Sequence, residues 1–353
     1  MGARLTAISG LAAKGPACFL VEANGKRLLL DLGRGPKGSP DIDLTGIGAI
    51  DAVALSHSHA DHTGALHWLE RIGNPSLHAT EVCGALIGRP VVPLPVRGQC
   101  VIAGITVETG RTGHAPGGAW LRLDVGEGLL YMSDHCVESV LYDFDPPPAA
   151  RTIVVDASYG DSTASLGPAI DKLRALAQAG SLLLPAPPDG RGPEIAIALS
   201  GAAPVAVCPA TRSIIDLLEG PARDYVRSGA LAALALLEPE ALGAASQPRG
   251  VMIAAGPDAG SGVAGELAGR WRNEGPAIVL TGYFGKASTA AELVAEGRAE
   301  VVRWNVHPRL QDQVTLVRST GAEIVVPAFG DFGPTGQSSL APANVIREPA
   351  IGL

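Results

Sequence analysis

The sequence of 353 residues has few cysteines, and no two of them lie close together. Their number is odd, and no Cys-x-x-Cys pair occurs. The five are Cys18, Cys83, Cys100, Cys136 and Cys208. This scatter argues against a disulfide framework or a thiolate zinc site, and it favours reduced, buried thiols.

Long apolar runs are also missing. No run reaches the roughly 18 residues that a membrane-spanning helix needs, so we expect no membrane association. Residues 1–11 lack the charged segment, the long apolar stretch and the cleavage pattern of a signal peptide. We expect them to form the first strand of the fold, and we take the cytoplasm as the expected location.

Positive charge is in deficit, with 27 Lys and Arg against 35 Asp and Glu and a net charge of −8. This argues against a strongly basic nucleic-acid-binding surface, although a local patch with bound metal ions can attract phosphates inside an acidic protein. The composition, 46% hydrophobic and 18% charged, is that of a globular protein. The length indicates two domains, or one domain with an insertion.

The most informative segment is residues 57–62, His-Ser-His-Ala-Asp-His, which holds three of the eight histidines. The apolar run 49–55 before it predicts a buried strand, and the spacing of Leu66, Leu69 and Ile72 after it predicts a helix. The histidines therefore lie on a strand-to-helix turn. In an extended chain the first two histidines point to the same side, which leaves the aspartate and the last histidine free to face a second point.

These nitrogen and oxygen ligands, without a thiolate, suit zinc and also manganese or iron. A polar loop whose histidines only form hydrogen bonds is the alternative, and the ligand types and spacing favour a metal site. Further candidate ligands lie at the ends of other strand-like runs. Asp31 closes the run 28–31, Asp134 closes the run 129–134, and His114 lies in the glycine-rich segment 112–119.

The texture of the chain changes at about residue 167. Before it, short strand-like runs are separated by glycine-rich turns, as in residues 17–21, 27–30, 104–107, 120–123 and 128–132. After it, strands alternate with helices, which predicts a parallel sheet with covering helices. A strand at 300–304, a helix at 308–319 and a strand at 323–326 follow. The tail from Asp331 is rich in Gly, Pro and Ser and predicts loop.

The ordered set of residues 57–62 with Asp31, His114 and Asp134 resembles the motifs of the metallo-β-lactamase superfamily. A second set resembles the β-CASP branch. Residues 153–160 are similar to its acidic-Ser-Thr-Tyr-Gly signature, and residues 190–195 to its Gly-Arg-x-x-Glu segment. Residues 281–283 and 306–307 resemble the end of its inserted domain and its second signature histidine.

The resemblance implies an α/β (α+β) fold, in which a metallo-β-lactamase αββα sandwich carries an inserted β-CASP α/β domain. The first part of the sandwich would comprise residues 1–166 and its final part residues 303–353. The β-CASP insert would comprise residues 167–302.

The resemblance also implies the site. Two metal ions, zinc in the first place, would be bound. The first would be held by His57, His59 and His114, and the second by Asp61 and His62. Asp134 would bridge both ions. Asp61 and Asp134 would thereby take part in catalysis. His307 would donate a proton to the leaving oxygen or contact the scissile phosphate.

Two further carboxylates have supporting roles by the same resemblance. Asp156 would orient a ligand histidine, and Asp31 would brace the loop that carries the cluster. The alternatives are a turn cap for Asp31, a loop carboxylate for Asp156 and a surface histidine for His307.

The sequence departs from the branch at one position. RNA-processing members carry a final histidine in a segment resembling Val-His-Gly-Glu, whereas Phe329 stands there if Gly330-Asp331 aligns with Gly-Glu. The second metal should therefore bind more weakly, unless Asp331 or His135 substitutes. For His135 we favour an orientation away from the metals. Some DNA-processing members also lack this histidine.

The leading hypothesis is a β-CASP-type nuclease, an exonuclease or an endonuclease, that cleaves phosphodiester bonds of single-stranded RNA or DNA by a metal-bound hydroxide. One alternative is a small-molecule hydrolase of the superfamily. Another is a weakly catalytic binding member with an incomplete second metal site. A homo-oligomer is left open. Residues 33–38 and Arg191 could contact a substrate phosphate, but a solvated turn and an ion pair with Glu194 are equally plausible.

Overall fold

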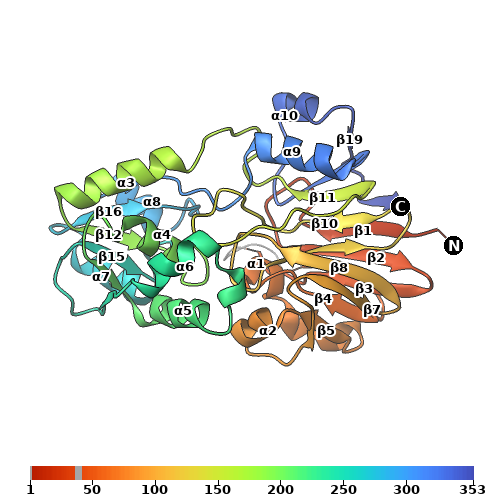
Figure 1. Ribbon diagram of the computed structural model, residues 1–353, viewed down its shortest axis with the longest axis horizontal. Helices are drawn as coiled ribbons and strands as arrows, with labels where there is room; N and C mark the ends of the chain where they lie inside the picture. The colour runs from red at the N-terminus through yellow and green to blue at the C-terminus, as the bar shows by residue number, and fades with distance from the viewer. Residues whose placement is uncertain (1, 36–41) are drawn as a thin grey trace. The chain divides into compact units, whose positions relative to one another are not determined.

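The computed structural model describes residues 2–35 and 42–353, so part of the loop 33–38 lies outside the described residues. The chain forms two compact units. Unit 1 comprises Met1–Val137, Asp143–Ala164 and His307–Leu353, and unit 2 comprises Glu138–Tyr142 and Ser165–Val306. Figure 1 shows the elements of both. No helix of the described part is long and apolar enough to cross a membrane.

Unit 1 contains two seven-stranded sheets. The first has the order β20 (Ala350–Gly352), β1 (Arg4–Ser9), β2 (Cys18–Ala23), β3 (Lys26–Leu30), β4 (Ala52–Ala54), β5 (Ser76–Ala79) and β6 (Val92–Pro93). The second has the order β19 (Asn344–Val345), β18 (Ile324–Ala328), β11 (Thr152–Asp156), β10 (Leu129–Tyr131), β9 (Ala119–Leu123), β8 (Ile105–Arg111) and β7 (Gly98–Ile102).

Local sequence explains the antiparallel part of the first sheet. Asn24 and Gly25 form the two-residue connection between β2 and β3, and both have positive φ, 53° and 73°. Asn-Gly is the preferred pair for such a hairpin, because both of its central residues must adopt the left-handed conformation. From β3 to β6 the strands are parallel, and so are β10, β11, β18 and β19.

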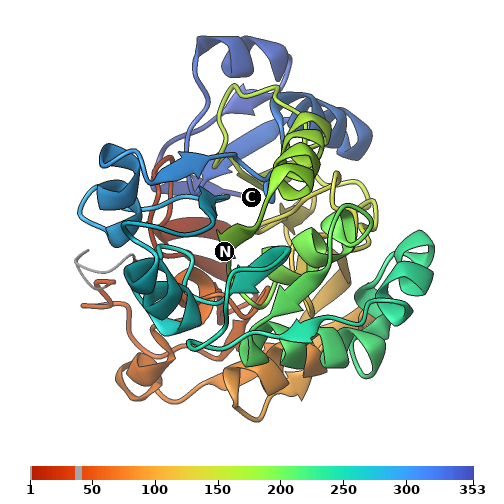
Figure 2. The same ribbon diagram turned by 90° about the vertical axis from the view of Figure 1, so that its left-hand side faces the viewer.

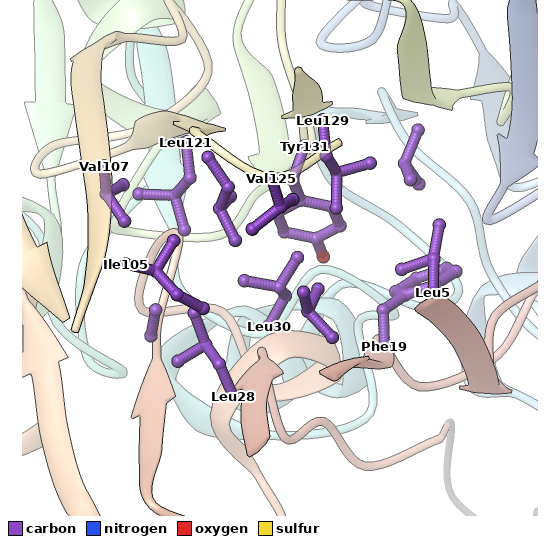
Figure 3. Close-up of a cluster of buried hydrophobic side chains, with 14 of the residues drawn as sticks. Leu5, Phe19, Leu28, Leu30, Ile105, Val107, Leu121, Val125, Leu129 and Tyr131 are labelled. Atoms are coloured by element: carbon purple, nitrogen blue, oxygen red, sulfur yellow. The ribbon is translucent and has the colours of Figure 1, made fainter. Parts of the chain in front are cut away.

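Apolar side chains fill the space between the two sheets. Figure 3 shows Phe19, Leu28 and Leu30 of the first sheet facing Leu121 and Tyr131 of the second. Because side chains alternate along a strand, the next residue, Leu29, faces the opposite side of the first sheet. The alternation thus gives each sheet an inner and an outer apolar face.

Helices cover both outer faces. On the first sheet, Leu29 belongs to a cluster with Leu66 of η1 (Leu66–Ile72) and Cys83 of α2 (Glu81–Ile87). The short helix α1 (Ala60–Thr63) directly precedes this region. On the second, Ile153 packs with Leu316 of α9 (Leu310–Thr320) and Leu340 after α10 (Pro334–Ser339). Unit 1 is therefore an αββα sandwich, the fold that the resemblance implied.

Unit 2 has one parallel sheet of six strands. The order is β14 (Glu240–Ala241), β13 (Val205–Val207), β15 (Val251–Ala254), β12 (Leu182–Pro185), β16 (Ala277–Leu280) and β17 (Ala299–Val301). Its helices are α3 (Gly167–Ala179), α4 (Arg191–Leu199), α5 (Pro209–Glu219), η2 (Arg223–Tyr225), α6 (Ser228–Ala235), α7 (Gly262–Arg270) and α8 (Thr289–Ala295). They lie on both faces of the sheet (Figure 2), which explains why its central strands are apolar throughout.

Glu194 of α4 joins the short segment 138–142 to unit 2. Its carboxylate accepts hydrogen bonds from Ser139 Oγ at 2.6 Å and Val140 N at 2.8 Å, and from Trp304 Nε1 at 2.7 Å. Burial raises the pKa of Glu194, although these donors oppose the shift. The three contacts explain why residues so distant in sequence belong to one unit.

Several local predictions differ from the structure. The predicted helix after residue 62 is the short α1 followed by the 3-10 helix η1. The tail from Asp331 was wrongly predicted as loop, since it forms α10, β19 and β20. These elements depend on tertiary contacts, because β20 pairs with β1 at an edge of the first sheet and β19 pairs with β18 at an edge of the second.

Leu121 tests the core between the sheets. It is fully buried there. We expect Leu121→Ala to lower the free energy of unfolding by about 2–5 kcal/mol, because it removes buried apolar surface and leaves a cavity. Val101→Ala is the control, since Val101 lies on β7 of the same sheet and is 64% exposed. Guanidinium denaturation measures both, and equal losses would contradict this description of the core.

Candidate metal centre

The candidate residues lie where parallel strands of unit 1 end. Asp31 follows β3, His57 lies three residues after β4, and Asp134 lies three residues after β10. Asp156 is the last residue of β11. Because parallel strands end at the same edge of their sheet, this topology gathers polar side chains at one edge of each sheet.

Three of these strand ends contain a residue with an unusual backbone conformation. Asp31 has φ 59°, Ser133 has φ 52° and Phe329 has φ 60°. Residues other than glycine rarely adopt positive φ, and they do so where surrounding contacts hold them in place. Each conformation turns the chain sharply as it leaves the sheet, and the turns after β3 and β10 lead directly into the site.

A first group of ligand atoms comes from His57, His59, His114 and Asp134, and all four atoms lie within 4.8 Å of one another. His59 Nδ1 lies 3.1 Å from His57 Nε2 and 3.1 Å from His114 Nε2. Two nitrogens bound to one tetrahedral zinc ion at about 2.0–2.1 Å lie about 3.3 Å apart, so this spacing fits a shared ion.

Burial shapes the protonation of this group. It lowers the pKa of His57 well below the ordinary value, and the neighbouring His62 and His59 lower it further, although Asp134 opposes them. His57 is therefore neutral, with a ring nitrogen lone pair available to a metal. The donor set therefore fits a zinc ion.

A second group comprises Asp61, His62 and Asp134. His62 Nδ1 lies 2.7 Å from Asp31 Oδ2, and its Nε2 lies 3.4 Å from Asp134 Oδ1. Burial disfavours the charged form of His62, but the carboxylates of Asp134 and Asp31 outweigh it and raise the pKa of His62. Asp134 Oδ1 is buried and has no hydrogen-bond partner among the described residues. This is expected of an oxygen that would bind a cation.

A third group comprises Asp134, Asp156 and His307. His307 Nδ1 lies 2.7 Å from Asp156 Oδ2 and 3.8 Å from Asp134 Oδ2. The other oxygen of Asp156 accepts a hydrogen bond from Ser158 N at 2.9 Å. The ring of Tyr159 contacts the His307 ring edge-on, with centroids 5.1 Å apart. His307 is thus held in a fixed orientation by its Nδ1 side.

The charges of the third group support one another. Burial disfavours the charge on His307, but Asp156 and Asp134 outweigh it and raise the pKa of His307. Burial likewise raises the pKa of Asp156, and His307 outweighs this and lowers it. His307 therefore keeps its proton to a higher pH than an ordinary histidine.

Phe329 lies next to the second group. Its ring contacts the His62 ring edge-on at 5.0 Å and the Phe19 ring at 6.4 Å, and it belongs to the core between the sheets. Asp331 forms an ion pair with Arg347 at 2.8 Å. His135 is buried, with Nδ1 3.3 Å from Ser133 O. In the described chain, none of the three groups includes Asp331 or His135.

Arg191 is buried within unit 2 and donates to Thr281 O at 3.0 Å. Its guanidinium lies against Gly282, where a Cβ would come within 2.2 Å of it. This packing favours a structural role for Arg191. In unit 1, Ser56, Tyr131 and Ser133 surround Asp31 and His62. No sequence motif indicated them, since Tyr131 lies within an apolar strand.

An αββα sandwich with histidines and aspartates gathered at its strand ends defines a protein built to bind metal ions. Residues 13–128 match the family model of the Metallo-beta-lactamase superfamily. This segment, which lies within unit 1, is similar to that superfamily. The resemblance seen in the sequence is confirmed at that level.

Three curated proteins match parts of the chain. The chain is 24% identical over 247 residues to "Transcription termination factor FttA" of Cenarchaeum symbiosum, covering 54% of this chain and 38% of that protein. It is 29% identical over 178 residues to "Ribonuclease TTHA0252" of Thermus thermophilus, covering 41% of each. It is 41% identical over 59 residues to "Cleavage and polyadenylation specificity factor 73" of Drosophila melanogaster, covering 15% of this chain and 9% of that protein. The matches thus span about two fifths or less of these relatives.

A solved structure has the same fold over its whole length. It is titled "Crystal Structure of a Protein of Unknown Function from Enterococcus faecalis V583", with a TM-score of 0.63 and 13% identity over 100% of both chains. At this identity the likeness shows the fold alone.

His57→Ala tests the first ligand group. We expect the purified variant to lose at least one metal ion per chain, because it removes one of three imidazoles that surround a common point. Metal analysis by mass spectrometry measures this. His67→Ala is the control, since His67 is exposed and stacks on Trp68 at 4.6 Å. If both variants retained the wild-type metal content, the first group would not hold a metal.

Proposed function

We propose that the chain is a metal-dependent nuclease of the β-CASP type that cleaves phosphodiester bonds of single-stranded RNA or DNA. Residues 1–166 and 303–353 are the metallo-β-lactamase domain, and residues 167–302 are the β-CASP insert. The observation that carries the proposal is the His307–Asp156 pair beside Asp134. It places a proton donor next to the metal ligands, as phosphodiester cleavage requires.

The ligand assignment follows the three groups. His57, His59 and His114 would hold the first ion, zinc in the first place, and manganese or iron would suit the same donors. Asp61 and His62 would hold the second ion, and Asp134, which belongs to both ligand groups, would contribute to both. When bound, such ions neutralise charge on the phosphate and lower the pKa of a coordinated water.

His307 supplies the proton that the leaving oxygen needs. Its Nδ1 is held by Asp156 and its pKa is raised, so it keeps its proton to a higher pH than an ordinary histidine. A general acid of this kind typically contributes about 100- to 10,000-fold to the rate. Asp156 keeps the imidazole oriented and compensates its positive charge.

One cation outside the three ligand groups is a candidate contact for an anionic substrate. The positive charge of Lys14, an exposed residue between β1 and β2, acts on His307. The main chain of this loop is fixed at Ala12, whose N–H donates to Pro327 O at 2.9 Å, and at Ala17, whose N–H donates to Asp61 O at 2.8 Å. A lysine held near the proton donor is suited to contact a phosphate.

A small-molecule hydrolase of the same superfamily is the second candidate, and the net charge of −8 is the observation that favours it. Incubation of zinc- or manganese-loaded protein with labelled single-stranded RNA and DNA separates the two. Cleavage of either supports the nuclease. Turnover of a small ester or lactam without any oligonucleotide cleavage would replace it by the second candidate.

The second ion is expected to be released first. Phe329 occupies the place at which the branch has a further imidazole, so this ion has fewer nitrogen ligands than the first. Stepwise dialysis against increasing chelator, followed by metal analysis, should show a one-ion plateau between two ions and none. Simultaneous release of both ions would contradict unequal sites.

His307→Ala should reduce oligonucleotide cleavage by about 100-fold or more and leave the metal content unchanged, because His307 donates a proton and is not assigned as a ligand. Single-turnover kinetics with parallel metal analysis measure both quantities. Wild-type cleavage by the variant would remove the proposed role, and loss of metal would make His307 a ligand instead.

A further inference from the structure

Tyr131 is a polar residue inside the apolar core of unit 1. Its ring is fully buried and packs against Phe19 at a centroid distance of 5.7 Å. Figure 3 shows the ring extending from the second sheet into the space between the two sheets. A phenylalanine would fill the same space, so packing alone does not require the hydroxyl. A buried hydroxyl needs a partner, and the partner is Asp31 Oδ2, 2.6 Å away.

Asp31 is fully buried and accepts hydrogen bonds from three segments of the chain. Oδ1 accepts from Ser56 N at 2.7 Å. Oδ2 accepts from Ser56 Oγ at 2.7 Å and Tyr131 Oη at 2.6 Å, and lies 2.7 Å from His62 Nδ1. The Ser56 hydroxyl in turn accepts a hydrogen bond from Ser133 Oγ at 2.6 Å. Ser56 therefore uses its own proton to donate to Asp31.

This arrangement determines how His62 presents itself. A carboxylate that already accepts from two hydroxyl groups and a main-chain amide can only accept from His62, so the Nδ1 of His62 carries a proton. Its Nε2 is then the nitrogen that faces Asp134, at 3.4 Å from Oδ1. The hydroxyl of Tyr131 limits the positions that the Asp31 carboxylate can adopt, and thereby the orientation of the His62 ring.

We propose that Tyr131 is a positioning residue for the second metal ion, because it holds the Asp31 carboxylate that orients His62. The inference rests on the proposed role of His62 as a ligand. It gains weight from Phe329, whose ring contacts His62 where the branch has another imidazole. With fewer ligands, the second ion depends more strongly on how His62 is held.

Zinc titration of the metal-free, full-length protein by calorimetry tests this. His62→Ala first identifies the ion that depends on His62. We expect Tyr131→Phe to lower the affinity for this ion by about 10- to 100-fold and to leave the affinity for the other ion unchanged. Wild-type affinity for both ions in Tyr131→Phe would overturn the proposal, and so would a His62→Ala variant that still binds every ion.

Tyr142→Phe is the matched control. Tyr142 is likewise a buried tyrosine, and its hydroxyl donates a hydrogen bond to Gly190 O at 2.9 Å within unit 2. The two variants remove the same atom from comparable surroundings, so a general loss of stability should affect both. Only Tyr131→Phe should change zinc affinity. An equal loss of affinity in both variants would mean that Tyr131 acts through stability alone.

A double variant tests whether Tyr131 acts through Asp31. Asp31→Asn should lower the affinity for the same ion, and adding Tyr131→Phe should lower that affinity no further. Independent, additive effects would overturn the proposal. If Tyr131→Phe does not fold, Ser56→Ala removes another donor to the same oxygen, and unchanged zinc affinity there would also overturn it. These measurements use zinc alone, so they stand even if the protein cleaves no nucleic acid.

Discussion

The buried carboxylate of Asp31 is the constraint on which the candidate metal centre depends. A charged group with no solvent exposure is tolerated only when hydrogen bonds satisfy it. Its partners are Ser56 and His62, which follow β4, and Tyr131, which ends β10. Satisfying one charge therefore brings three strand ends together, and the residues that follow two of them are the candidate ligands.

Electrostatic balance explains how the rest of the site remains buried. Asp134 belongs to all three ligand groups. Burial raises the pKa of Asp134, but His62 and His307 outweigh burial and hold it well below the ordinary value. His62 and His307 shift in the opposite direction for the same reason. The site thus pairs its carboxylates with imidazoles, and bound cations would take over part of this compensation.

The two halves of the proposed site are built differently. The first rests on three imidazoles that face one point, so its geometry depends on the ligands themselves. The second rests on Asp61 and His62, and His62 is held between Asp31 on one side and the ring of Phe329 on another. In this half, the residues that hold His62 would matter more for the affinity of the second ion, and here the sequence departs from the branch it resembles.

The sequence alone indicated the fold class, a resemblance to the metallo-β-lactamase superfamily and the clustering of candidate ligands at strand ends. The clustering follows from local periodicity and from the spacing within residues 57–62, whereas the fold is what the resemblance of these motifs implies. The tertiary structure decided the hydroxyl contact of Tyr131, the packing of Phe329 on His62 and the strands of the C-terminal tail. Each of these joins residues far apart in the chain, so it depends on how two sheets pack and pair, and no local pattern records that.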